Sequence, residues 1–163
     1  MTRAYVPLNL AGLQGLRDSG LLAAEDAYAV TPELRAAYAG AGTTEEEDLE
    51  YVALTVAARV SLTLLDEEDP DDRRRIVVAV DAETESGEGH PARVLIGAAV
   101  PLARVASVHV DTDDLKPMVD AAVEALPAAA DGDPDAVELV EALDGEDLAW
   151  FAVQELPDVL GGQ

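Results

Sequence analysis

Three residues near the middle of the chain carry the groups of a hydrolytic triad. Ser107, His109 and Asp111 stand at alternate positions, and side chains two apart on a strand project from the same face. Neighbours on one face are about 7 Å apart, which is long for a serine–imidazole hydrogen bond. The strained glycine–serine turn that exposes a hydrolase nucleophile is also missing. We therefore expect no catalytic residue here and interpret His109 as a hydrogen-bonded strand histidine.

A binding role for the same residues stays open. If the strand face that carries His109 lines a cavity with Tyr51 or Arg59, these side chains would meet in a ligand pocket. Arg59 lies on the most apolar predicted helix, and the residues four positions away on either side are threonines. It must therefore find a distant carboxylate, extend to solvent or hold an anion. The candidate ligand-pocket residues are His109, Ser107, Asp111, Arg59 and Tyr51.

A second candidate site lies near the end of the chain. Trp150 and Phe151 follow Glu146 and Asp147 and precede Glu155. An exposed ring beside acidic residues is suited to anchoring a partner, so Trp150, Phe151 and Glu155 are candidate partner contacts. Packing of both rings in the core is the competing interpretation.

Metal and cofactor sites are not predicted. The chain has no cysteine, which excludes thiolate ligands and thiol catalysis. Asp131, Asp133 and Asp135 imitate a calcium loop, but Ala136 and Ala142 replace its required glycine and glutamate. We interpret these aspartates as helix-capping and loop residues. Gly12 and Gly15 follow the first predicted strand, but the segment has neither the lysine of a phosphate-binding loop nor the three glycines of a dinucleotide-binding loop.

Net charge sets the choice of partners. The chain has 34 acidic and 10 basic residues, a formal net charge of −24. Such a charge repels nucleic-acid phosphates and anionic membranes and attracts basic protein surfaces. We therefore expect no nucleic-acid and no membrane partner, and a basic protein surface as the possible one. The near-absence of lysine, asparagine and isoleucine also fits a host with a GC-rich genome, and the acidity fits a halotolerant one.

The fold class is predicted to be α+β. The 163 residues suit one domain, 1–163, with no interdomain linker, and no apolar run is long enough to cross a bilayer. We expect a single mixed or antiparallel sheet of about five or six strands packed against several helices. Strands are predicted at 3–8, 27–30, 76–80, 93–100, 105–110 and 150–153, with 76–80 and 93–100 as a hairpin.

The predicted central helix spans about 44–65. Thr44 and Glu47 form a capping box at its start, and two apolar stripes imply burial on two sides. A later helix from about Asp114 is expected to end at Pro127. Arginines 73–75 are expected to neutralise the acidic loop before them. In the strand 105–110, alternation predicts Ala106, Val108 and Val110 on the core face.

Several segments together resemble a known family. They are Arg-Ala-Tyr-Val-Pro-Leu at 3–8, Ala-Val-Thr-Pro-Glu-Leu at 29–34, Asp-Leu-Glu-Tyr at 48–51, Ala-Ser-Val-His-Val-Asp at 106–111 and Trp-Phe-Ala-Val-Gln-Glu-Leu-Pro at 150–157. The chain resembles a family of small acidic proteins of unknown function from GC-rich Gram-positive bacteria. The resemblance implies no activity, cofactor or catalytic residue.

Three functions follow from these observations. The leading hypothesis is a non-enzymatic cytoplasmic protein that acts through protein–protein contacts. The alternative is a small-ligand binder or enzyme with a pocket near His109, Arg59 and Tyr51. The third is a mimic of nucleic acid that occupies a DNA-binding site.

Overall fold

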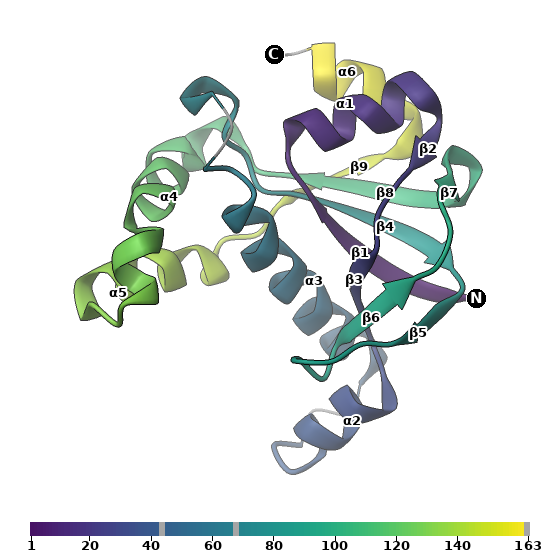
Figure 1. Cartoon of the computed structure of the whole chain (residues 1–163), viewed down its shortest axis with the longest axis horizontal. Helices are drawn as coiled ribbons and strands as arrows, with labels where there is room; N and C mark the ends of the chain where they lie inside the picture. The colour runs from purple at the N-terminus through teal and green to yellow at the C-terminus, as the bar shows by residue number, and fades with distance from the viewer. Residues whose placement is uncertain (43–44, 67–68, 162–163) are drawn as a thin grey trace.

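The computed structural model describes residues 1–42, 45–66 and 69–161 and has the α+β architecture (Figure 1). Its main sheet has seven strands, one or two more than expected, and every neighbouring pair is antiparallel. In spatial order the strands are β5 (Thr84–Ser86), β6 (Arg93–Ile96), β3 (Asp26–Ala29), β1 (Thr2–Leu8), β4 (Ile76–Ala82), β8 (Val105–Val110) and β9 (Ala149–Ala152). A second, two-stranded sheet pairs β2 (Leu21–Leu22) with β7 (Val100–Pro101).

The predicted hairpin between 76–80 and 93–100 is wrong. β4 pairs with β1 and β8, whereas β6 pairs with β3 and β5. β4 is apolar on both faces and is buried along almost its whole length, so it belongs at the centre of the sheet. The extra strand β5 lies between the two segments of the predicted hairpin, where three residues form a strand and the chain then turns back to pair as β6.

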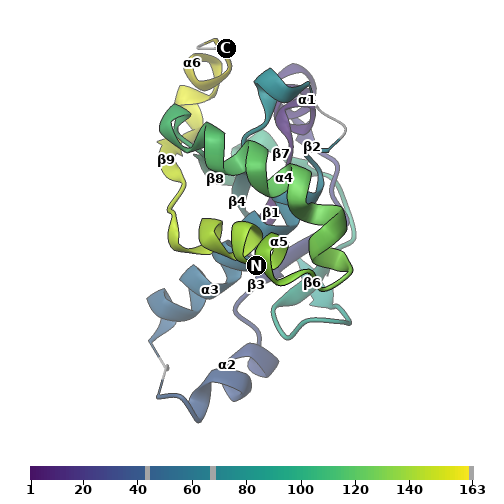
Figure 2. The same cartoon turned by 90° about the vertical axis from the view of Figure 1, so that its left-hand side faces the viewer.

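Helices cover the two faces of the sheet differently. α1 (Leu10–Ser19) and α6 (Leu156–Gly161) pack on one face, where their leucines join the larger apolar core. α3 (Glu46–Thr63) crosses the other face (Figure 1). α4 (Lys116–Ala130) and α5 (Pro134–Glu141) lie side by side and enclose a third core with the end of α3 (Figure 2). α2 (Pro32–Ala39) begins at Thr31, whose hydroxyl accepts the Leu34 N–H as its cap.

α3 is unbroken, and its burial agrees only in part with the two predicted stripes, because Ala58 and Leu62 are buried whereas Val52, Val56 and Leu64 are not. Its fully buried line is Leu49, Ala53, Ala57 and Ser61, which are spaced four residues apart. Small side chains let the helix approach the sheet closely, and the larger valines beside them are only partly buried. Thr44, the predicted cap, lies outside the described residues. The helix ends at Thr63, two residues before the predicted end.

α4 continues past Pro127, where the sequence predicted its end. Proline removes one helical hydrogen bond, but Val119, Ala122 and Val123 hold α4 against α5 through Ala136 and Val140. The arginine triplet also differs from expectation. Arg73, Arg74 and Arg75 pair with Asp120, Asp113 and Asp111, which are acids far along the chain; the described acids of the preceding loop, Asp66, Asp69, Asp71 and Asp72, form no ion pair with them.

A bulge in β8 changes the predicted strand alternation. Val80 lies opposite Val105 and Ala79 lies opposite Ser107, so Ala106 is the extra residue. As a result Val105 joins Val108 and Val110 in the core beneath α1 and α6, and Ala106 packs on the α3 side. The predicted core set is therefore correct for Val108 and Val110 and wrong for Ala106.

No helix in the described part of the chain is long and apolar enough to cross a bilayer.

Candidate functional site

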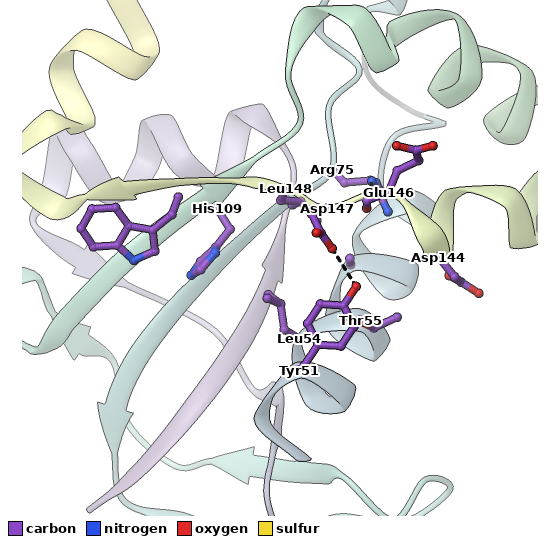
Figure 3. Close-up of a pocket in the computed structure, with 11 residues that line it drawn as sticks. Tyr51, Leu54, Thr55, Arg75, His109, Asp144, Glu146, Asp147 and Leu148 are labelled. Atoms are coloured by element: carbon purple, nitrogen blue, oxygen red, sulfur yellow. Dashed lines mark hydrogen bonds between the residues drawn. The ribbon is translucent and has the colours of Figure 1, made fainter. Parts of the chain in front are cut away.

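A cleft of about 260 Å³ opens on the α3 side of the sheet. α3 packs over β1, β3 and β4, so the neighbouring surface of β8 and β9 lies beside the helix and not beneath it. The connecting segment between α5 and β9, residues 142–148, closes one end of the cleft (Figure 3). The lining residues are Tyr51, Leu54, Thr55, Ala58, Arg75, His109, Asp144, Glu146, Asp147, Leu148 and Trp150.

Tyr51 forms the outer wall of the cleft. Its ring projects from α3 and is 48% exposed, and its hydroxyl donates a 2.7 Å hydrogen bond to Oδ1 of Asp147. Figure 3 shows this bond joining α3 to the connecting segment. The hydrogen bond to the carboxylate, which stabilises the neutral phenol, raises the pKa of Tyr51. Tyr51 therefore stays neutral and fixes Asp147 at the rim.

His109 projects from β8 into the inner part of the cleft (Figure 3). It is 9% exposed, and its Nε2 lies 3.0 Å from the hydroxyl of Ser107. Burial lowers the pKa of His109 because desolvation disfavours the charged imidazolium. The cleft therefore presents a neutral imidazole at neutral pH, held by a neighbour on the same strand face.

Asp111 does not complete a triad with this pair. Its carboxylate binds Arg75 through two side-chain hydrogen bonds of 2.9 and 2.8 Å and also accepts the Arg75 backbone N–H. No carboxylate among the described residues bonds to His109. A serine–histidine pair without an orienting acid lacks the arrangement that activates a nucleophile.

Arg75 supports the cleft from behind. Its guanidinium also donates 3.0 Å hydrogen bonds to the backbone carbonyls of Leu143 and Glu146. These contacts fix the connecting segment against the start of β4. Because Asp111 matches the charge of Arg75, this arginine does not neutralise Asp144, Glu146 or Asp147 of the cleft.

Arg59 lies outside the cleft and holds one of its acids. The guanidinium pairs with Asp144 through two hydrogen bonds, one of them 3.2 Å from Nε to Oδ1. The distant carboxylate anticipated from the sequence is therefore Asp144. The structure brings Tyr51 and His109 to the cleft, with Ser107, Asp111 and Arg59 one contact away from it.

The three candidate partner contacts separate. Trp150 is 62% exposed and lines the cleft. Phe151 points to the opposite side of the sheet and packs against the core there. Glu155 accepts the backbone N–H of Ala152 at 2.7 Å, so its carboxylate caps the turn after β9.

Several lining residues were not anticipated. Glu146 and Asp147 were noted only as acids before the aromatic pair, and Asp144 and Leu54 were not proposed as site residues. The available signal was the cluster of acids directly before an aromatic pair. Within residues 1–42, 45–66 and 69–161 no three His, Asp or Glu side chains gather to hold a metal ion.

The chain belongs to a family of unknown function, DUF6912, whose model matches residues 2–160. Searches among curated proteins and among solved structures found no match.

Proposed function

We propose that this protein is a non-enzymatic binding module that takes a cationic side chain of a basic protein partner into the cleft. The observation that carries the proposal is the pairing of two exposed aromatic rings, Tyr51 and Trp150, with carboxylates in one cavity. An arginine or lysine can stack on such rings while its charge meets the acids. Neither ring is needed for the core.

The charge of the cleft favours a cation. Asp144, Glu146 and Asp147 line it, and Arg75 is the one basic residue among the described lining. Arg75 is neutralised by Asp111, and His109 contributes no charge. Even with Arg59 counted against Asp144, Glu146 and Asp147 have no basic partner among the residues that the structure describes. The net charge of −24 adds a long-range attraction that speeds the approach of basic surfaces.

The neutral histidine fits the same role. A charged imidazolium at the inner wall would repel an arginine or lysine, whereas a buried neutral imidazole does not. Binding of this kind requires no catalytic step. We propose that it takes place in the cytoplasm. We also propose that the family as a whole consists of strongly acidic proteins from GC-rich Gram-positive bacteria.

The test is calorimetric titration with short peptides at about 0.15 M salt. One peptide carries a single central arginine, a second carries lysine, and a third carries uncharged citrulline. The arginine peptide should bind saturably, the lysine peptide more weakly, and the citrulline peptide not at all. Trp150→Ala should weaken arginine binding about tenfold, because a desolvated cation–π contact is worth up to about 2 kcal/mol.

Non-specific attraction needs a matched control in so acidic a protein. Asp147→Asn and Asp135→Asn each remove one negative charge, but Asp135 lies on the exposed surface of α5. Only Asp147→Asn should weaken binding. Equal effects of both variants, with Trp150→Ala unchanged, would show general electrostatic attraction and overturn the proposal. Equal affinity for the peptide and for free arginine amide would replace the protein partner by a small cationic ligand.

A further inference from the structure

Arg104 differs from every other basic side chain of the protein. Nine of the ten lysine and arginine side chains lie within ion-pair distance of a carboxylate. Within the described ranges Arg104 has no such partner, and its guanidinium contacts the thioether sulfur of Met1. A thioether is a weak acceptor. Among the described residues of this acidic chain, Arg104 is therefore an exposed arginine without a carboxylate partner.

Arg104 lines a second cavity, of about 290 Å³, that shares no residue with the cleft. This cavity lies at the other end of the sheet strands, where β4 and β6 end and β7 begins, near the N-terminus in Figure 1. Its wall is mainly apolar. The apolar wall residues are Ala82, Ile96, Val100 and Pro101.

The same cavity is lined by backbone with spare hydrogen-bond donors. Gly97, Ala98 and Ala99 connect β6 to β7 and are exposed. On either side, Ile96 N–H donates to Glu25 and Leu102 N–H donates to Gly20. The three N–H groups between them have no protein acceptor within the described residues. Exposed N–H groups without a protein acceptor are available to donate to a bound carboxylate.

The two acids of this cavity, Asp81 and Glu83, repel a bound anion only weakly. Asp81 is bound to Arg3, with its Oδ1 2.9 Å from the arginine Nε. The Glu83 side chain is 86% exposed, so water screens its charge. Asp81 pairs with Arg3, and Glu83 lies 4.0 Å from the Met1 amino group, so neither acid needs Arg104 as its counter-charge.

We propose that this cavity binds a small organic carboxylate with an apolar tail. The head accepts hydrogen bonds from the Arg104 guanidinium and from the free N–H groups of 97–99. The tail displaces water from Ala82, Ile96 and Val100. An apolar wall with a few donors at one side is the arrangement typical of small-molecule sites.

The probe is hexanoate, followed by amide chemical shifts of the ¹⁵N-labelled protein. Saturable shifts at Gly97, Ala98 and Ala99 are expected. Hexanol has a similar tail without the charge, and inorganic phosphate has charge without a tail, so both should bind at least about tenfold more weakly. Phosphate binding as tightly as hexanoate would overturn the apolar-tail assignment, and hexanol doing so would overturn the role of the carboxylate.

Two arginine variants separate recognition from general charge. Arg104→Gln should weaken hexanoate binding about tenfold, because a charge-assisted hydrogen bond is lost. Arg17→Gln is the control, since Arg17 is an exposed residue of α1 paired with Asp18, and it should leave the affinity unchanged. Equal losses in both variants, or no loss in Arg104→Gln with unchanged amide spectra elsewhere, would contradict the proposal.

Discussion

The guanidinium of Arg75 and the carboxylate of Asp111 form a two-pronged ion pair in the interior, with the two side chains 3% and 2% exposed. Nε donates to Oδ2 at 2.9 Å and Nη2 donates to Oδ1 at 2.8 Å. The pair joins the start of β4 to the end of β8, and the remaining donors of Arg75 hold the segment that closes the cleft. The geometry of the cleft therefore depends on a buried electrostatic contact.

Removing one partner of this pair should destabilise the fold strongly. Asp111→Asn leaves a buried guanidinium without its counter-charge, which costs about 3–5 kcal/mol in comparable sites. Urea unfolding measures the change. Asp113→Asn is the control, because Asp113 pairs with Arg74 but its side chain is 86% exposed, and its loss should stay below about 1 kcal/mol. Similar losses in the two variants would show that burial does not make the Arg75–Asp111 pair special.

Ser61 should be a second point of high sensitivity. Its hydroxyl donates to the Leu8 carbonyl at 2.6 Å and accepts the Ile76 N–H at 2.9 Å, so it connects α3 to both β1 and β4. Ser61→Ala leaves two backbone groups unpaired in the interior and should cost about 1–3 kcal/mol. Thr63→Val removes an exposed hydroxyl that bonds only within α3 and serves as the reference. A neutral Ser61→Ala would mean that these backbone groups find other partners.

The stability contributed by His109 should depend on pH. Burial lowers its folded-state pKa below the ordinary value of 6.5, so the unfolded chain takes up the proton first as pH falls. The contribution is complete above pH 6.5 and is lost as pH falls from there toward the folded-state pKa. The difference in unfolding free energy between the wild type and His109→Gln should therefore shrink on acidification. An unchanged difference across that interval, measured in urea, would contradict the lowered pKa.

The sequence predicted the elements better than their pairing. Local signals placed α3 and the apolar strand β4 correctly, because periodicity and strand composition act within a few residues. The strands that pair with β4 were not predicted, since strand pairing depends on contacts between segments that are distant in sequence. Pro127 was misread because packing between α4 and α5 outweighs the loss of one hydrogen bond.

The cleft was harder to anticipate because it too is formed by contacts between residues that are distant in sequence. His109 and Tyr51 could be proposed together only as a possibility, because no local pattern fixes the distance between a helix and a strand. Asp144 and Asp147 were missed as site residues, since their roles depend on Arg59 and Tyr51, which lie far away in sequence. The alternation of apolar residues in β8 also gives no sign of the bulge at Ala106, although this bulge decides that Val105 lies on the same face of the sheet as Val108.

The proposed site holds a cation between the exposed rings of Tyr51 and Trp150 and the nearby acids, and the fluorescence of Trp150 reports whether that site is occupied. Trp150 is the only tryptophan of the chain, so its fluorescence reports on this cleft alone. Saturation with the single-arginine peptide should reduce acrylamide quenching of Trp150, and Asp147→Asn should require more peptide for the same protection. Quenching that stays unchanged while calorimetry shows the peptide fully bound would place the peptide elsewhere and contradict the account.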